Sequence, residues 1–292
     1  MTVQITYCRV VLFYGMLSNL FLTYCVCWRI LQGQVQKRGD SNLEKNFEIK
    51  EMPVEYSDNS IYGKAYIPLN KTGGLSAVIL CHGYNSSYRH MTDLAEVLAE
   101  NGVFAYCFDF CGGAVVSMSS GKPADMSIRT EICDLNAVAE MIRGLECVAP
   151  DRVYLYGESQ GGFVSALTAA ERPENFAGLF LLYPAFCIPD DWEKFAAGNN
   201  SDSFELMGMT LSRKFYDELP EYDVFSYVSR YDKSVVIAHG TADTVVSVEY
   251  SRRLVKSFPD AELTEFENEG HGFSATARKK WREQICRKLC GR

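Results

Sequence analysis

RVYLYGESQGGFVSALTAA, the stretch from Arg152 to Ala170, passes from a strand-like pattern to an alanine-rich, helix-like one. Between the two patterns, residues 157–161 read Gly-Glu-Ser-Gln-Gly and match G-x-S-x-G. In that motif a serine occupies a sharp turn from strand to helix, and glycines allow the close backbone approach that the turn needs. The stretch therefore predicts a nucleophile elbow with Ser159 as the nucleophile.

A serine hydroxyl needs a base within hydrogen-bond reach, and a third group must orient that base. The chain has four histidines. His271 lies in ENEGHGFSATA, a glycine-flanked loop between the last expected strand and the last helix, where its ring can reach over the sheet edge. His82 and His239 end two central strands and His90 begins a helix. His271 is therefore the candidate base.

The candidate acid is Asp243, which follows the apolar run SVVIAHG. Ligand and catalytic sites of open α/β sheets lie at the carboxyl ends of the strands. A turn-forming aspartate is the alternative interpretation of GTAD. Glu267 and Glu269 compete for the role but stand too close in sequence to the histidine. The order serine, aspartate, histidine is the one expected of α/β-hydrolases.

Two backbone N–H groups must stabilise the oxyanion that forms during acyl transfer. Gln160 follows the nucleophile and supplies one from the start of the helix. Tyr84 follows CHG at the end of the first central strand and is placed to supply the other, with His82 and Gly83 shaping that loop. This chemistry requires no metal or organic cofactor.

Strands and helices alternate from about Phe47 onward, which predicts a mostly parallel sheet with helices on both faces. The run IYGKAYIPL (61–69) alternates like an edge strand. We expect one domain over 46–292. Further strands are expected at 76–81, 103–110, 152–157, 178–183, 234–240 and 261–267, and helices at 91–102, 128–145, 163–170 and 248–258 and up to about Cys290.

The stretch from about 185 to 230 is rich in aromatic residues and longer than a single crossover requires. Insertions of this kind in a compact domain are usually lids or binding loops. The alternative is that the aromatic residues only pack a small subdomain. We expect a lid.

Charge and cysteine usage exclude some partners. The formal net charge is −8 and no large Lys/Arg cluster is present, which argues against a nucleic-acid partner. The eleven cysteines have irregular spacing with no zinc-binding pattern. They indicate a reducing compartment, and the expected location is the cytoplasm.

The first 45 residues form a separate segment, in which 10–28 is an uncharged apolar run close to the length of a membrane helix. Basic residues follow the run, so an anchor would keep the main domain on the cytoplasmic side. The alternative is an over-extended start that is not part of the working protein.

From about Tyr62 to Leu289 the chain resembles the α/β-hydrolase superfamily, and more narrowly the bacterial cinnamoyl and feruloyl esterases with a small lid. The blocks that carry the resemblance are CHGYNSSYRHMTDLAEVLAENGVFAYCFDF, YGESQGGFVSALTAA, LLYPAF, IAHGTADTVVS and EGHGF, in this order. The chain departs from that family in two places. The family usually has histidine where Glu158 stands, and its loop G-H-G-x-S after Asp109 here reads CGGAVVSMSSGK.

The resemblance implies a serine carboxylesterase acting on hydroxycinnamoyl or other aryl or short acyl esters. In that esterase family polar lid residues hold the phenolic hydroxyl, and Asp190, Asp191 and Tyr216 are candidate counterparts. A monoacylglycerol-type lipase or a serine aminopeptidase would use the same machinery. A non-catalytic ligand-binding module on this fold is the alternative from another class. The expected partner is a small-molecule ester, and the oligomeric state stays open.

Overall fold

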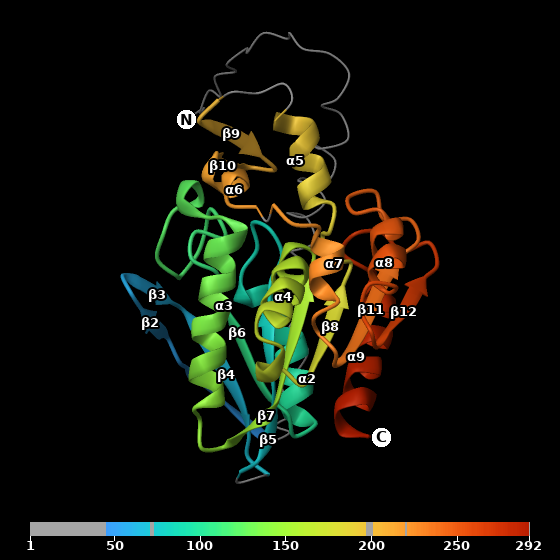
Figure 1. The fold of residues 1–292 in the computed structure, drawn as a ribbon. Coiled ribbons are helices and arrows are strands. Elements are labelled where there is room, and N and C mark those ends of the chain that lie inside the picture. Colours follow the sequence, from blue (N-terminus) through green and yellow to red (C-terminus); the bar gives the residue numbers. More distant parts are fainter. Residues whose placement is uncertain (1–44, 71–72, 197–200, 220, 292) are drawn as a thin grey trace, which may run out of the picture. The chain divides into compact units, whose positions relative to one another are not determined.

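The computed structural model describes residues 45–291 except 71–72, 197–200 and 220. Eight strands of this part form one sheet in the order β1-β4-β6-β5-β7-β8-β11-β12 (Figure 1). Their bounds are β1 Phe47–Glu51, β4 Gly63–Pro68, β5 Leu75–Cys81, β6 Phe104–Phe108, β7 Val148–Glu158, β8 Gly178–Leu182, β11 Ser234–Gly240 and β12 Ala261–Phe266. β4 is antiparallel to both of its neighbours, and every pairing from β6 to β12 is parallel.

The prediction of an edge strand at 61–69 was wrong. β4 lies inside the sheet, between β6 and β1, and β1 forms the edge. The sequence of β1, FEIKE, contains charged residues on both faces and a single buried residue, Phe47, so its strand signal is weak. Its pairing with β4 covers the edge that the alternating pattern had suggested was open.

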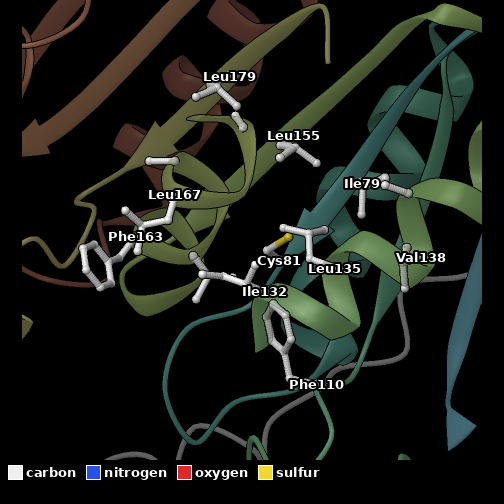
Figure 2. Close-up of a cluster of buried hydrophobic side chains, with 14 of the residues drawn as sticks. Ile79, Cys81, Phe110, Ile132, Leu135, Val138, Leu155, Phe163, Leu167 and Leu179 are labelled. Atoms are coloured by element: carbon white, nitrogen blue, oxygen red, sulfur yellow. The ribbon is translucent and has the colours of Figure 1, made fainter. Parts of the chain in front are cut away.

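Helices cover both faces of the sheet, as predicted. Their bounds are α2 Thr92–Glu100, α3 Ile128–Arg143, α4 Gln160–Glu171, α5 Ile188–Ala196, α6 Lys214–Asp217, α7 Val224–Val228, α8 Val248–Leu254 and α9 Ala275–Cys290. Residues of α3 and α4 pack with Ile79, Leu155 and Leu179 on one face of the sheet (Figure 2). On the other face, residues of α2 and α9 pack with Val78 and Leu80.

The apolar run of β5 from Ala77 to Cys81 follows from this layering. Successive strand residues point to opposite faces. Ile79 and Cys81 therefore face α3 and α4, whereas Val78 and Leu80 face α2 and α9. A strand that is covered on both faces reads as a nearly continuous apolar run. The exception in β5 is Ser76, whose hydroxyl accepts a hydrogen bond from Nε of Arg152.

Between β8 and β11 the chain forms a small layer of its own. It contains α5, α6 and a hairpin of β9 Ser203–Leu206 and β10 Met209–Ser212, whereas α7 packs against α4. The hairpin turn, Met207 and Gly208, has two positive φ angles of 43° and 84°, the geometry of a tight primed turn. In Figure 1 the hairpin, α5 and α6 lie beyond the ends of the central strands. A second hairpin pairs β2 Val54–Tyr56 with β3 Asn59–Ile61.

The parallel arrangement brings several loops to one edge. The carboxyl ends of β5, β7, β8, β11 and β12 meet there. The connections after β5, β7, β11 and β12 carry Tyr84, Ser159, Asp243 and His271. Within the described residues no helix has both the length and the apolar character to span a bilayer. The apolar run 10–28 and the predicted segment 1–45 fall outside those residues, apart from Lys45.

Candidate active site

Ser159 occupies the turn between β7, which ends at Glu158, and α4, which begins at Gln160. Its φ of 53° and ψ of −119° are rare for a residue other than glycine and cost on the order of 1–3 kcal/mol. Four backbone hydrogen bonds hold this conformation: the Ser159 amide donates to a carbonyl of β8, and its carbonyl accepts from the amides of Gly162, Phe163 and Ala185.

Two glycines of the motif are required by close backbone contacts. A Cβ built at Gly161 would lie 2.3 Å from the carbonyl oxygen of His82 and 2.5 Å from that of Cys81. A Cβ built at Gly157 would lie 2.3 Å from the carbonyl oxygen of Gly161. The start of α4 therefore lies directly against the end of β5, which brings the loop after β5 to the nucleophile. The helix begins at Gln160, earlier than the predicted Phe163, and Gly161 and Gly162 belong to its first turn.

The structure brings the three predicted triad residues together. The Ser159 hydroxyl lies 3.1 Å from Nε2 of His271, and Nδ1 of His271 lies 2.8 Å from Oδ2 of Asp243. With Nδ1–H donating to the carboxylate, Nε2 is free to accept the serine proton. Glu267 and Glu269, the competing acids, lie elsewhere: Glu269 accepts hydrogen bonds from the amide and hydroxyl of the serine that begins α9.

The Asp243 carboxylate is buried and held by several donors. Burial raises the pKa of this carboxyl, but hydrogen bonds from His239, His271 and the Val246 amide outweigh burial and keep the pKa well below its usual value. The amide of Val245 also donates to it, at 2.9 Å. The acid is therefore ionised at neutral pH and fixed in place, as the orienting member of a triad must be.

Neither of the two strand-end histidines forms the contact with the Ser159 hydroxyl, which His271 makes. His82 donates from Nδ1 to the Gly83 carbonyl and accepts at Nε2 from the Phe110 amide, so it joins the loops after β5 and β6. Nδ1 of His239 accepts from the Ser251 hydroxyl, and its Nε2 donates to a carbonyl of the loop after β11 and also lies 3.3 Å from Oδ2 of Asp243. Both rings are buried with both nitrogens engaged, which agrees with the choice of another histidine as base.

The two predicted oxyanion donors flank Ser159. A Cβ built at Gly83 would lie 3.2 Å from the Ser159 Cβ, so the backbone leading into Tyr84 passes beside the nucleophile. The side chain of Tyr84 donates from its hydroxyl to the Leu206 carbonyl, at 2.7 Å. Within the described residues no acceptor pairs with the backbone N–H of Tyr84 or Gln160. The oxyanion role of both amides stays a prediction.

Sequence reasoning missed a buried acid behind the elbow. Glu131 of α3 accepts a hydrogen bond of 2.9 Å from the side-chain amide of Gln160. Burial raises the pKa of Glu131 to about 8, although the hydrogen bond from Gln160 acts in the opposite direction. In the sequence Glu131 resembles an ordinary first-turn helix acid, and only the packing of α3 against α4 reveals its burial.

Two cavities border Ser159. The first, the apolar cavity, has a volume of about 200 Å³ and is lined mainly by Ile188, Leu206, Met207, Phe215, Tyr216 and Val245, with one carboxylate, Asp191. The second, called the polar cavity after its ionisable side chains His90, Glu158, His271 and Arg278, has a volume of about 310 Å³. Both cavities are also lined by Tyr84, Ser159, Met207 and Val245. Of the other candidate lid residues, Asp190 accepts a hydrogen bond from the Tyr250 hydroxyl.

The sheet order, the strained serine turn and the histidine and aspartate that meet it define an α/β-hydrolase. Residues 75–235, more than half of the chain, match the family described as serine aminopeptidase, S33, and the chain belongs to this family.

Individual relatives are distant. An uncharacterized protein of Mycobacterium tuberculosis is 26% identical over 206 residues, which are 70% of this chain and 66% of that protein. The match thus spans just under two thirds of the relative's length. Monoglyceride lipase of Rattus norvegicus is 28% identical over 37% of this chain and 34% of its own. Est1E from Butyrivibrio proteoclasticus, solved with ferulic acid bound, has a TM-score of 0.73 at 24% identity and covers 82% of this chain and 96% of its own. This last likeness shows the fold.

Proposed function

We propose that the protein is a serine hydrolase that cleaves carboxylic esters through Ser159, His271 and Asp243. The observation that carries the proposal is the 3.1 Å contact between the Ser159 hydroxyl and Nε2 of His271, with the ring fixed on its other side by a buried carboxylate. A serine held by a strained turn and paired with an oriented base is an activated nucleophile.

The reaction follows from these positions. His271 takes the proton as Ser159 attacks the carbonyl carbon, and Asp243 stabilises the imidazolium that forms. The amides of Tyr84 and Gln160 receive the oxyanion. His271 then protonates the leaving alcohol, and water, deprotonated by the same histidine, hydrolyses the acyl-enzyme.

We assign the acyl group and the alcohol of the ester to one cavity each. His271 lines the polar cavity and must protonate the leaving group, so we assign the alcohol to that cavity. The acyl group then occupies the apolar cavity, which Gln160 borders, while Tyr84 borders both cavities. Its volume of about 200 Å³ is smaller than that of a typical drug-sized site and suits one aromatic ring or a short chain.

Most of the wall of the apolar cavity comes from the segment 185–230. Leu206 and Met207 come from the β9–β10 hairpin, Phe215 and Tyr216 from α6, and Ile188 from α5. We propose that this segment is a lid that selects the acyl group. The Asp191 carboxylate at the cavity would accept a phenolic hydroxyl, which favours hydroxycinnamoyl or other aryl esters, and the likeness to a structure that holds ferulic acid supports the same class.

A peptide or monoacylglycerol substrate is the second candidate, because the family description and the rat lipase point to those classes. The test is to treat the protein with a fluorophosphonate and to assay methyl ferulate, p-nitrophenyl butyrate, p-nitrophenyl octanoate and an aminoacyl anilide. We expect labelling at Ser159, turnover of methyl ferulate and butyrate, and no labelling or turnover in Ser159→Ala. Turnover of the octanoate or the anilide alone would move the substrate class, and a fully active Ser159→Ala would refute the proposal.

A further inference from the structure

The residue before the nucleophile, Glu158, is a buried carboxylate at the end of β7. Only 5% of its surface is exposed. It accepts hydrogen bonds from the hydroxyls of Tyr156 at 2.6 Å and Tyr183 at 3.1 Å, and from Nη1 of Arg278 at 3.1 Å. Nε2 of His90 lies 3.2 Å from its other oxygen. The proposed reaction assigns no step to this cluster.

Arg278 connects this carboxylate to the loop that carries the candidate base. From the first turn of α9, its Nε donates to the carbonyl of Gly272 at 3.0 Å, and its Nη2 lies 3.1 Å from both the Tyr183 hydroxyl and Nε2 of His90. Gly272 directly follows His271. One guanidinium thus joins the residue before Ser159 to the residue after His271.

Tyr183 adds a second contact between the same groups. It directly follows β8 and has a φ of 36°, unusual for a bulky residue. Its ring centroid lies 4.3 Å from that of His271, while its hydroxyl is held by both Glu158 and Arg278. The ring that packs against the imidazole is therefore fixed by the ion pair.

The loop itself supplies little rigidity. Gly270 and Gly272 flank His271, and Gly272 has a φ of 100°, so the backbone on both sides of the base lacks side-chain restraint. A base must be held close to its productive geometry, since small misplacements of reacting groups lower rates strongly. Arg278 can supply that restraint because its planar fork of donors engages several acceptors at fixed angles.

We propose that Glu158 and Arg278 are positioning residues that fix the His271 loop over Ser159, rather than only a structural ion pair. The inference rests on the proposed function of Ser159 and His271. The carboxylate orients the guanidinium, the guanidinium holds the Gly272 carbonyl, and Tyr183 carries the same restraint to the imidazole face.

The test compares Arg278→Lys with Arg282→Met. A lysine keeps the positive charge beside Glu158 but cannot reach the Gly272 carbonyl, the glutamate and the Tyr183 hydroxyl together. The control, Arg282, lies one turn further along α9 and pairs with the exposed Asp93 at 3.3 Å, away from the loop. The double variant Glu158→Gln/Arg278→Met removes both charges and so avoids leaving one buried charge unpaired.

We expect Arg278→Lys to remain folded and to lose roughly 10- to 100-fold in kcat for p-nitrophenyl butyrate with little change in KM. The double variant should show the same loss. The downfield proton resonance of the His271 ring N–H that is bonded to Asp243 should broaden or shift in both, and it should be unchanged in Arg282→Met.

A folded Arg278→Lys or double variant with the wild-type kcat and an unchanged ring N–H resonance would overturn the inference. The proposed function fails separately, if wild-type protein neither reacts with the fluorophosphonate nor turns over any ester. In that case the ring resonance, which needs no activity, still decides whether Arg278 positions the His271 loop.

Discussion

The side-chain amide of Gln160 donates a hydrogen bond of 2.9 Å to Glu131, a buried carboxyl group of α3 with no cationic partner among the described residues. The same residue, Gln160, provides a proposed oxyanion donor through its backbone. Glu131, whose raised pKa favours the protonated form, therefore contacts the first residue of α4.

The first prediction follows from that acid. Burial raises the pKa of Glu131 to about 8 in the folded protein, whereas an unfolded glutamate ionises near about 4.3. The folded state thus binds more protons between these values, so the contribution of Glu131 to the free energy of unfolding is complete below about pH 4 and is lost as pH rises toward 8. Asp134, raised to about 6 by burial, acts in the same direction.

We expect Glu131→Gln to reduce the loss of unfolding free energy between pH 5 and pH 8, by on the order of a few kcal/mol. Urea unfolding at the two pH values measures it. The control is Glu140→Gln, which changes a glutamate of the same helix that pairs with Arg172 at the surface. Equal pH dependence in wild type and Glu131→Gln would contradict the prediction.

Asp243→Asn tests the orienting role of the acid. An amide can leave His271 in the wrong tautomer, and loss of an orienting aspartate lowers kcat by on the order of 10⁴-fold in a triad enzyme. We expect that size of loss in p-nitrophenyl butyrate hydrolysis, with KM nearly unchanged. Glu267→Gln, at the competing acid, should retain the wild-type rate. If Glu267→Gln were the inactive variant, the assignment of the acid would be wrong.

Gly161→Ala tests the close approach at the elbow. The added methyl group would meet backbone oxygens of β5 and its loop at 2.3 and 2.5 Å, and neither can move without shifting the central strand. We expect a loss of about 1–3 kcal/mol or more in unfolding free energy, together with lost activity. Gly144→Ala is the matched control, since its φ is −81° and its nearest atoms lie at 3.5 Å. Equal melting temperatures of Gly161→Ala and Gly144→Ala in thermal unfolding would contradict this prediction.

Acyl selection by the apolar cavity can be tested at Ile188, a half-buried side chain of α5 that lines it. Ile188→Ala should enlarge the cavity and raise kcat/KM for p-nitrophenyl octanoate relative to the butyrate, by roughly 10-fold. Val116→Ala, at a residue that is 80% exposed and does not line the cavity, should leave the ratio unchanged. An unchanged ratio in Ile188→Ala would mean that the acyl group lies elsewhere.

The parts that the sequence predicted well are those with strong local signals. SVVIAHG was expected as a strand at 234–240 and forms β11 with those bounds, because an apolar run buried on both faces has few alternatives. Ser159, Asp243 and His271 were placed at strand ends by motif and chain order, and these ends meet in the structure. Their catalytic roles stay predictions.

The parts that were missed depend on distant partners. The charged sequence FEIKE becomes a strand only because β4 offers it an edge. The pairing of Glu158 with Arg278 joins residues 120 positions apart, and nothing local to either residue indicates the other. The burial of Glu131 likewise arises from the packing of α3 on α4, which its own helix pattern does not reveal.

The hydrogen bond from the Tyr84 hydroxyl to Leu206 ties one wall of the apolar cavity to the loop whose amide is the proposed oxyanion donor. An acyl group too wide for the cavity must push the β9–β10 hairpin outward. The hairpin is hydrogen-bonded to the loop of Tyr84, and that loop must keep its position if its amide is to bind the oxyanion. A poor fit of the acyl group would then lower kcat rather than raise KM. Bulky esters should accordingly behave as tightly bound, slowly processed competitors of the small ones.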